Sequence, residues 1–157
     1  KNMAPRQHMR KMKVGKVTFT EAYKAVHEYR QKFPEKAVTF YAQNYPAMGW
    51  AVFMAGGSCP VIPCTDKAFL KDAAAMEVEE TDTDNYKKMV KSDIGSIIYS
   101  KSGTEIPVQL SSGKYALKYI HLASGKIETI NKSLRINGLY KLKVPDKKEG
   151  IYWFHKL

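Results

Sequence analysis

The sequence IPVQLSSGKYALKYI, residues 106–120, decides the fold class of the second half of the chain. Apolar and polar positions alternate in it, and the same alternation returns at 140–144. A period of two is typical of a strand with one buried face, because successive side chains of a strand point to opposite faces. The predicted buried faces consist of Ile106, Val108 and Leu110, of Tyr115, Leu117 and Tyr119, and of Tyr140, Leu142 and Val144.

Turn-forming residues separate these predicted strands. They are Ser102-Gly103, Ser112-Gly113, Ser124-Gly125, Asn137-Gly138 and the stretch 145–150. Serine, asparagine and glycine at these places favour turns. Six short strands are therefore expected, and a sheet with one apolar face must cover that face with a second layer. The pattern predicts a small antiparallel β-sandwich with Trp153 in its core.

The first half of the chain begins its regular structure with a predicted helix. A helix capped by Thr20 carries four apolar residues at helical spacing and ends at Pro34. Those four residues are Ala22, Val26, Tyr29 and Phe33, and we expect them to form one buried face. The run 36–41 is rich in β-branched and aromatic residues, which predicts a strand buried on both faces.

An apolar segment at 49–58 follows, with glycines at both ends. It is too apolar for the surface and predicts a core element. A second helix is expected after Thr65 or Asp66, either of which can cap it, and its buried face would consist of Phe69, Ala73 and Met76. The acidic stretch 77–84 is typical of a solvated linker.

The net charge of +11 comes almost entirely from lysine. A positive surface of this size can attract an anionic polysaccharide or a nucleic acid. The lysines are nevertheless scattered rather than gathered in an arginine-rich stripe, which favours solvated surface lysines and makes nucleic acid an unexpected partner. Cys59 and Cys64 can form a disulfide in an oxidising compartment, but the two prolines in the short loop between them disfavour it, and unpaired thiols are the default prediction. No apolar stretch approaches the roughly 20 residues of a membrane span.

The order of segments in the second half resembles a known family. The series begins with Ser96 to Ser100, a turn at Gly103, the strand 106–110, Gly113 to Ile120 and Ser124-Gly125-Lys126. It ends with 139–144, Pro145-Asp146, Gly150 and Ile151 to Phe154. It resembles the carboxy-terminal β-sandwich, of the collagen-binding-domain type, that follows the catalytic barrel in glycoside-hydrolase-like proteins of Bacteroides-type bacteria. Residues 50–58 and 69–73 are similar to the last strand and last helix of that barrel.

The resemblance implies an α+β chain in two parts. Residues 1–85 would be the carboxy-terminal part of a (β/α) barrel, and residues 86–157 an antiparallel β-sandwich that serves as an accessory domain. The parent protein would be an exported, glycoside-hydrolase-like carbohydrate-active protein, located in the periplasm, at the cell surface or outside the cell, and the resemblance leaves open whether it is catalytically active. Its partners would be a polysaccharide or oligosaccharide and the remainder of the barrel, and no cofactor is implied.

A glycosidase needs two carboxylates that flank the scissile bond. Related barrels carry them at the ends of the fourth and seventh strands, but the run most similar to the seventh strand ends in Phe-Tyr-Ala-Gln-Asn-Tyr, residues 40–45, without Asp or Glu. We therefore predict no complete catalytic site in this chain. The side chains expected to contact a sugar are Tyr41, Gln43, Asn44, Tyr45 and Trp50, because amides and phenols bind hydroxyls and aromatic faces pack on sugar rings.

Four alternatives remain open at this point. Tyr41 to Tyr45 can be a polar turn between buried elements, and Trp50 can be a core residue. The whole chain can instead be a stand-alone basic module that binds an acidic polysaccharide or nucleic acid, or a structural domain without a ligand. The four histidines have no metal-ligand spacing, so no metal site is predicted.

Overall fold

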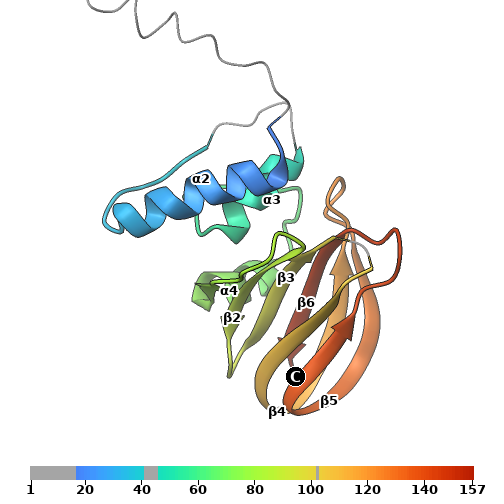
Figure 1. The fold of residues 1–157 in the computed structure, drawn as a ribbon. Helices are drawn as coiled ribbons and strands as arrows, with labels where there is room; N and C mark the ends of the chain where they lie inside the picture. Colours follow the sequence, from blue (N-terminus) through green and yellow to red (C-terminus); the bar gives the residue numbers. More distant parts are fainter. Residues whose placement is uncertain (1–16, 41–45, 102) are drawn as a thin grey trace, which may run out of the picture.

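The computed structural model describes residues 17–40, 46–101 and 103–157. Three helices precede or flank one six-stranded sheet (Figure 1). The helices are α2 (Phe19–Lys32), α3 (Pro46–Met54) and α4 (Lys67–Ala75). The strands are β1 (Glu77–Glu79), β2 (Tyr86–Lys91), β3 (Gly95–Ser100), β4 (Glu105–Ile120), β5 (Ile127–Lys143) and β6 (Gly150–Lys156). The chain therefore has the mixed helix and antiparallel sheet composition that was expected.

The strand order is β1-β2-β3-β6-β4-β5, and each pair of neighbours is antiparallel. The described residues contain no parallel strand pair of the kind that a (β/α) barrel would contribute. β6 lies in the middle of the sheet, between β3 and β4. β6, the last of the six strands in the sequence, therefore connects β1, β2 and β3 on one side of the sheet to β4 and β5 on the other.

Two long strands give the sheet its sandwich-like shape. β4 has 16 residues and β5 has 17. The two strands predicted before and after Gly113 are therefore one continuous strand, β4. The predicted turns at Ser112-Gly113 and Asn137-Gly138 are wrong: residues 111 and 112 of β4 face the single residue Asn137 of β5, which is a β-bulge. A bulge bends a strand without ending it, and Figure 1 shows both strands curving round.

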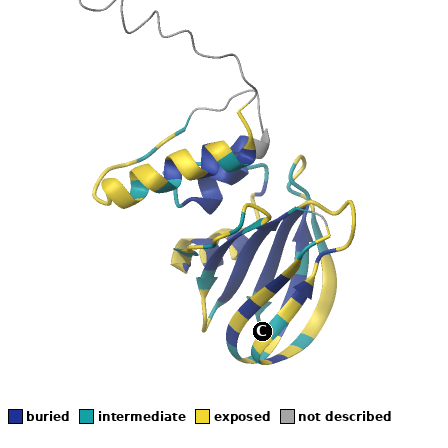
Figure 2. Cartoon of the chain, in the orientation of Figure 1, coloured by how far each residue is buried: buried dark blue, intermediate teal, exposed yellow. Residues whose placement is uncertain are grey.

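The sheet is buried on both faces in its centre (Figure 2). One hydrophobic core joins the three helices to Ile97, Tyr99 and Trp153 of the sheet. The other core lies on the opposite face, where Ile98 and Phe154 pack against the curled parts of β4 and β5. The alternation predicted for β4 is confirmed at residues 105–110, where Ile106, Val108 and Leu110 are buried between exposed neighbours. It is wrong at residues 115–120, where Ala116 and Ile120 are buried as well as Tyr115, Leu117 and Tyr119. Trp153 is fully buried as expected.

The apolar segment 49–58 differs from the strand that the resemblance implied, because its first part is helix α3. All the residues from Trp50 to Met54 are buried, and a helix that is apolar on every side belongs to a core. Gly49 lets this helix approach the chain at Val61, since a Cβ at position 49 would lie 1.7 Å from the Val61 carbonyl oxygen. A run of continuous apolar residues does not distinguish a buried strand from a buried helix.

Three smaller expectations also change. Thr18, not Thr20, caps α2, and it forms a capping box with Glu21. The described part of the predicted strand 36–41 is extended chain without a strand partner. Residues 77–79 of the acidic stretch form β1, which pairs with β2 at the edge of the sheet, rather than a linker.

Helix α4 begins after Asp66, as predicted, and buries Phe69 and Ala73. Cys59 and Cys64 are unpaired, with Cys59 exposed and Cys64 buried. No described helix combines the length and hydrophobicity that crossing a membrane requires. The helices and the sheet share one core across residue 85, and the division into 1–85 and 86–157 stays a prediction.

Candidate functional site

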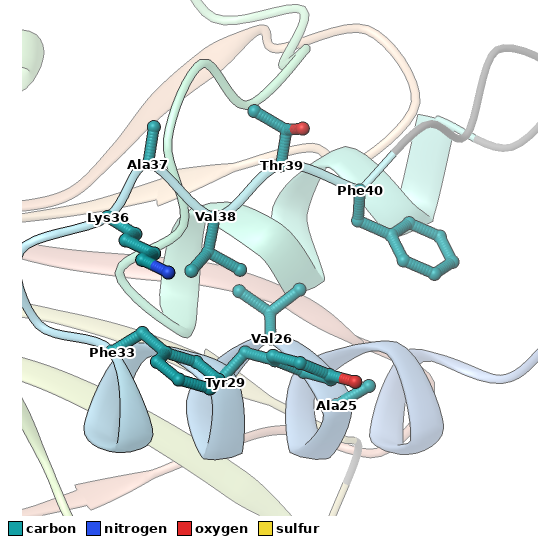
Figure 3. A pocket seen from close by; sticks show the side chains of 9 residues that line it. All are labelled: Ala25, Val26, Tyr29, Phe33, Lys36, Ala37, Val38, Thr39 and Phe40. Atoms are coloured by element: carbon teal, nitrogen blue, oxygen red, sulfur yellow. The ribbon is translucent and has the colours of Figure 1, made fainter.

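A groove runs between α2 and the extended segment that follows it (Figure 3). Its volume is about 470 Å³, and we call it the α2 groove. The lining residues are Ala25, Val26, Tyr29, Phe33, Lys36, Ala37, Val38, Thr39 and Phe40. Seven of these nine side chains are apolar or aromatic, and none is a carboxylate. The groove therefore offers surfaces for contact and a few hydrogen-bonding groups, but no acid–base pair.

The groove exists because only the first part of α2 is covered by the hydrophobic core, and the last part extends beyond it. Its first part buries Phe19, Ala22, Tyr23 and Val26 in the core. The predicted apolar face continues with Tyr29 and Phe33, but these residues are 56% and 37% exposed. The expectation that all four residues of that face are buried is thus correct for Ala22 and Val26 and wrong for the last two.

Hydrogen bonds fix the turn that closes one end of the groove. Phe33 is the C-cap of α2, and its N–H donates to the carbonyl oxygen of Tyr29. Pro34 follows and cannot continue the helix. The Arg30 guanidinium donates to the carbonyl oxygens of Pro34 and Lys36, in both cases at 3.1 Å. The chain therefore reverses direction at a defined place and returns alongside the helix.

The returning segment is held from its other side by Ser58. The Ser58 N–H donates to the Val38 carbonyl oxygen at 2.7 Å, and the Val38 N–H donates to Ser58 Oγ at 3.2 Å. Gly57, the residue before Ser58, packs closely on α2 and α3, since a Cβ there would lie 2.6 Å from Val52 Cγ1 and 2.8 Å from Val26 Cγ1. Figure 3 shows the Val38 and Phe40 side chains pointing from this segment toward α2.

Two exposed aromatic rings form the floor of the groove at its α2 side. The rings of Tyr29 and Phe33 lie nearly parallel, with centroids 6.1 Å apart and planes at 26°. Lys36 Nζ lies 5.1 Å from the centroid of the Phe33 ring. Such rings present apolar faces to a ligand, while the Tyr29 hydroxyl and the lysine ammonium supply hydrogen-bond donors. This combination suits a ligand that has both C–H faces and hydroxyl groups.

The sequence-predicted site residues fall into two groups. Tyr41, Gln43, Asn44 and Tyr45 lie outside the described residues, and Phe40 at the end of the groove directly precedes them in the chain. Trp50 is described, and its predicted role in sugar binding is wrong. Its ring is fully buried, it packs edge-on against Phe53 and Phe69, and its Nε1–H donates to the Leu122 carbonyl oxygen at 2.9 Å.

The other side of α2 is polar and contacts the sheet. Lys24 pairs with Asp84 at 2.9 Å, which lowers the pKa of the Asp84 carboxyl. Burial, together with the nearby Glu80 carboxylate, raises the pKa of Tyr23 to about 12. Burial also lowers the pKa of Lys87, whose Nζ lies 4.8 Å from the centroid of the Tyr23 ring. These contacts attach α2 to the sheet and leave its aromatic side open.

A buried carboxylate that the sequence did not reveal ties α4 to the last strand. Asp72 Oδ2 accepts hydrogen bonds from Trp153 Nε1 at 2.9 Å and from His155 Nδ1 at 2.7 Å. Asp72 is only 8% exposed. More than 80 residues separate it from its partners, so only the fold brings them together. Its role here is to position the helix on the sheet.

Two comparisons with known proteins match parts of the chain. A family model described as "Domain of unknown function (DUF6298)" matches residues 1–76, which end one residue before β1 begins. No curated protein matches the chain. A solved structure titled "Glycoside hydrolase" is similar with a TM-score of 0.39 and 15% identity, over 53% of this chain and 20% of that chain. The chain thus spans about a fifth of the length of that protein.

Proposed function

We propose that this chain is the carboxy-terminal part of an exported carbohydrate-active protein and that it contacts a glycan through the α2 groove. The observation that carries the proposal is the exposed, nearly parallel pair of rings of Tyr29 and Phe33 in a groove of about 470 Å³. Sites for small ligands usually measure about 300–1,000 Å³ and combine apolar walls with a few polar groups. The amide and phenol groups of residues 41–45 follow the groove in the chain and would add hydrogen bonds to sugar hydroxyls.

The sheet would act as the accessory and stabilising domain of the parent protein. The packing of α3 and α4 on the sheet supports this role, because Phe69 lies edge-on to both Trp50 and Trp153. The helical part would belong to the end of a barrel whose remaining strands carry the catalytic carboxylates. The chain itself would supply glycan contacts and stability, and any glycosidase activity would belong to the whole protein in the periplasm, at the cell surface or outside the cell.

A binding experiment with neutral polysaccharides tests the groove. Affinity electrophoresis of the chain in gels that contain xyloglucan, galactomannan or laminarin should show retardation by at least one of them. Replacing Tyr29 and Phe33 together by alanine should weaken that binding about tenfold or more, since each ring contributes about 1 kcal/mol of stacking. Replacing Gln43 and Asn44 together by alanine should weaken it as well, with the unfolding midpoint nearly unchanged.

Leu70→Ala provides the matched control. Leu70 is 41% exposed, like the groove residues, but lies on α4 outside the groove. This variant should bind as the wild-type chain does. The proposal fails if the Tyr29/Phe33 variant retains wild-type affinity for every glycan that the chain binds, or if Leu70→Ala loses the same affinity.

A further inference from the structure

A second hollow, of about 360 Å³, lies on the long strands β4 and β5 rather than on the helices. Ser112, Gly113, Lys114, Arg135, Ile136 and Asn137 line it. It sits beside the bulge at residues 111 and 112, where the two strands bend. We call it the bulge hollow. Its lining contains two cations, one amide and one hydroxyl, and no carboxylate.

The strand register brings the polar groups of the hollow to one face. Lys114 and Arg135 are direct partners across the ladder, and partners in an antiparallel pair point to the same side. The neighbouring residues Tyr115 and Ile136 are 0% and 2% exposed and point into the core on the opposite side. Lys114 and Arg135 themselves are exposed. Two positive side chains thus stand side by side over the hollow.

This pairing is electrostatically unfavourable unless an anion joins it. Like charges directly opposite each other in a sheet destabilise it. Among the ion pairs of the described residues, none within 4.0 Å involves Lys114 or Arg135. Within the described residues the fold therefore holds two cations together with no carboxylate oxygen within 4.0 Å of either. An oxyanion bound between them would remove the repulsion.

The remaining polar groups also favour an anion. Ser112 Oγ donates a hydrogen bond to Asn137 Oδ1 at 2.6 Å. This bond occupies the acceptor side of the Asn137 amide and leaves its nitrogen to donate to a ligand. Lys114, Arg135 and Asn137 therefore present donors to the hollow. A guanidinium offers two parallel N–H groups, which match the two oxygens of a carboxylate.

We propose that the bulge hollow binds the carboxylate of a uronic acid unit in an acidic polysaccharide. This inference rests on the proposed glycan-binding function and names a second class of glycan for it. A hollow of about 360 Å³ is in the size range of small-ligand sites, and the net charge of +11 attracts a polyanion from a distance. Single-stranded nucleic acid is disfavoured because such sites stack bases on aromatic rings, and none of the six lining residues is aromatic.

The test measures binding of the full chain to polygalacturonate, to its methyl-esterified form and to duplex DNA. The esterified polymer has the same backbone with its carboxylates neutralised, so it isolates the charge. The wild-type chain should bind polygalacturonate, with an affinity that falls as salt rises, and should bind the ester at least tenfold more weakly. Replacing Lys114 and Arg135 together by glutamine should reduce polygalacturonate affinity at least tenfold.

The matched control replaces Lys132 and Lys143 by glutamine. Both are exposed residues of β5 outside the hollow, and the control lowers the net charge by the same two units. It should reduce the affinity less than threefold. The Lys114/Arg135 variant should unfold at or above the wild-type temperature, because it removes a like-charge pair. Equal losses of polygalacturonate affinity in the two variants would show non-specific attraction and overturn the inference. It would also be overturned if the wild-type chain did not bind polygalacturonate. A third refuting result would be that the chain binds DNA more tightly than polygalacturonate and that the Lys114/Arg135 change abolishes the DNA binding.

The two sites can fail separately. If polygalacturonate binding is unaffected by the Lys114/Arg135 change while the Tyr29/Phe33 variant loses neutral glycans, the bulge hollow is refuted and the α2 groove stands. The opposite pattern supports the hollow as an anionic glycan site and refutes the groove.

Discussion

Replacing Asp72 by alanine should lower the free energy of unfolding by about 3 kcal/mol. Asp72 Oδ2 accepts one hydrogen bond from Trp153 and one from His155. Without the carboxylate, the N–H of the fully buried Trp153 ring has no acceptor, which costs about 1–3 kcal/mol. The His155 side chain is 29% exposed and can turn to water, so its loss costs less. The carboxylate's own desolvation penalty is recovered and offsets part of the total.

A double-mutant cycle separates the orphaned donor from other effects. Trp153→Phe removes the N–H group, so Asp72→Ala in that background should cost about 1–2 kcal/mol less than in the wild-type chain. Urea unfolding at pH 7, followed by circular dichroism, gives all four free energies. The fluorescence of Trp50 remains as a second probe in each variant.

Two results would contradict this explanation of the cost of Asp72→Ala. An Asp72→Ala variant within 0.5 kcal/mol of the wild-type chain would mean that the carboxylate contributes nothing net. A cost that is equal in both backgrounds would mean that the Trp153 hydrogen bond is not the cause. His155→Gln is the control, because it removes only the partly exposed partner and should cost less than Asp72→Ala.

Two further predictions concern backbone packing and alkaline pH. Gly49→Ala should destabilise the chain by about 3 kcal/mol or more, since its Cβ would overlap the Val61 carbonyl. Gly113→Ala is the control, because a Cβ there meets nothing closer than 3.4 Å. Thermal melts that give the two variants equal melting temperatures would contradict this prediction. Burial raises the pKa of Tyr23 and of Tyr152 to about 12, so the folded state holds these protons more tightly than the unfolded state, where the pKa is about 10. The contribution of these two tyrosines to stability should be constant below about pH 10 and should then fall by up to about 1.4 kcal/mol per pH unit for each tyrosine. Tyr152→Phe should therefore flatten the fall in urea midpoints between pH 9 and 12.

The sequence predicts the first part of β4 well because only one face of that part is buried. The alternation of Ile106, Val108 and Leu110 with exposed neighbours follows directly from the pleat of a strand. It does not predict the length of β4, since Ser-Gly pairs occur both in turns and in bulges. The bulge at Ser111 and Ser112 depends on what the two halves of the strand pack against, and that is decided by the whole fold.

The helical part shows the opposite balance. The caps and the end of α2 are visible in local sequence, and so is the cap of α4. The identity of α3 is not, because a continuous apolar run fits a buried strand as well as a buried helix. The exposure of Tyr29 and Phe33 is equally hidden, since the helical period shows which residues share a face but not how far along that face the neighbouring elements extend.

The candidate sites depend on contacts between distant parts of the chain. The sequence makes Trp50 a candidate sugar contact, but its ring is buried and packs edge-on against Phe53 and Phe69. In the sequence Lys114 and Arg135 are two among 26 scattered cations. The ladder between β4 and β5 makes them neighbours, and register over so long a hairpin cannot be deduced from composition or charge.

The central position of β6 has a consequence for the synthesis of the protein. Residues 150–156 supply Trp153 to one core and Phe154 to the other, and they separate β3 from β4 in the sheet. A ribosome makes these residues after every other strand. The β4–β5 hairpin is local and can form early, but neither core can close on the emerging polypeptide until β6 has left the exit tunnel. Until then the apolar faces of α3 and β3 lack the strand that completes their cores.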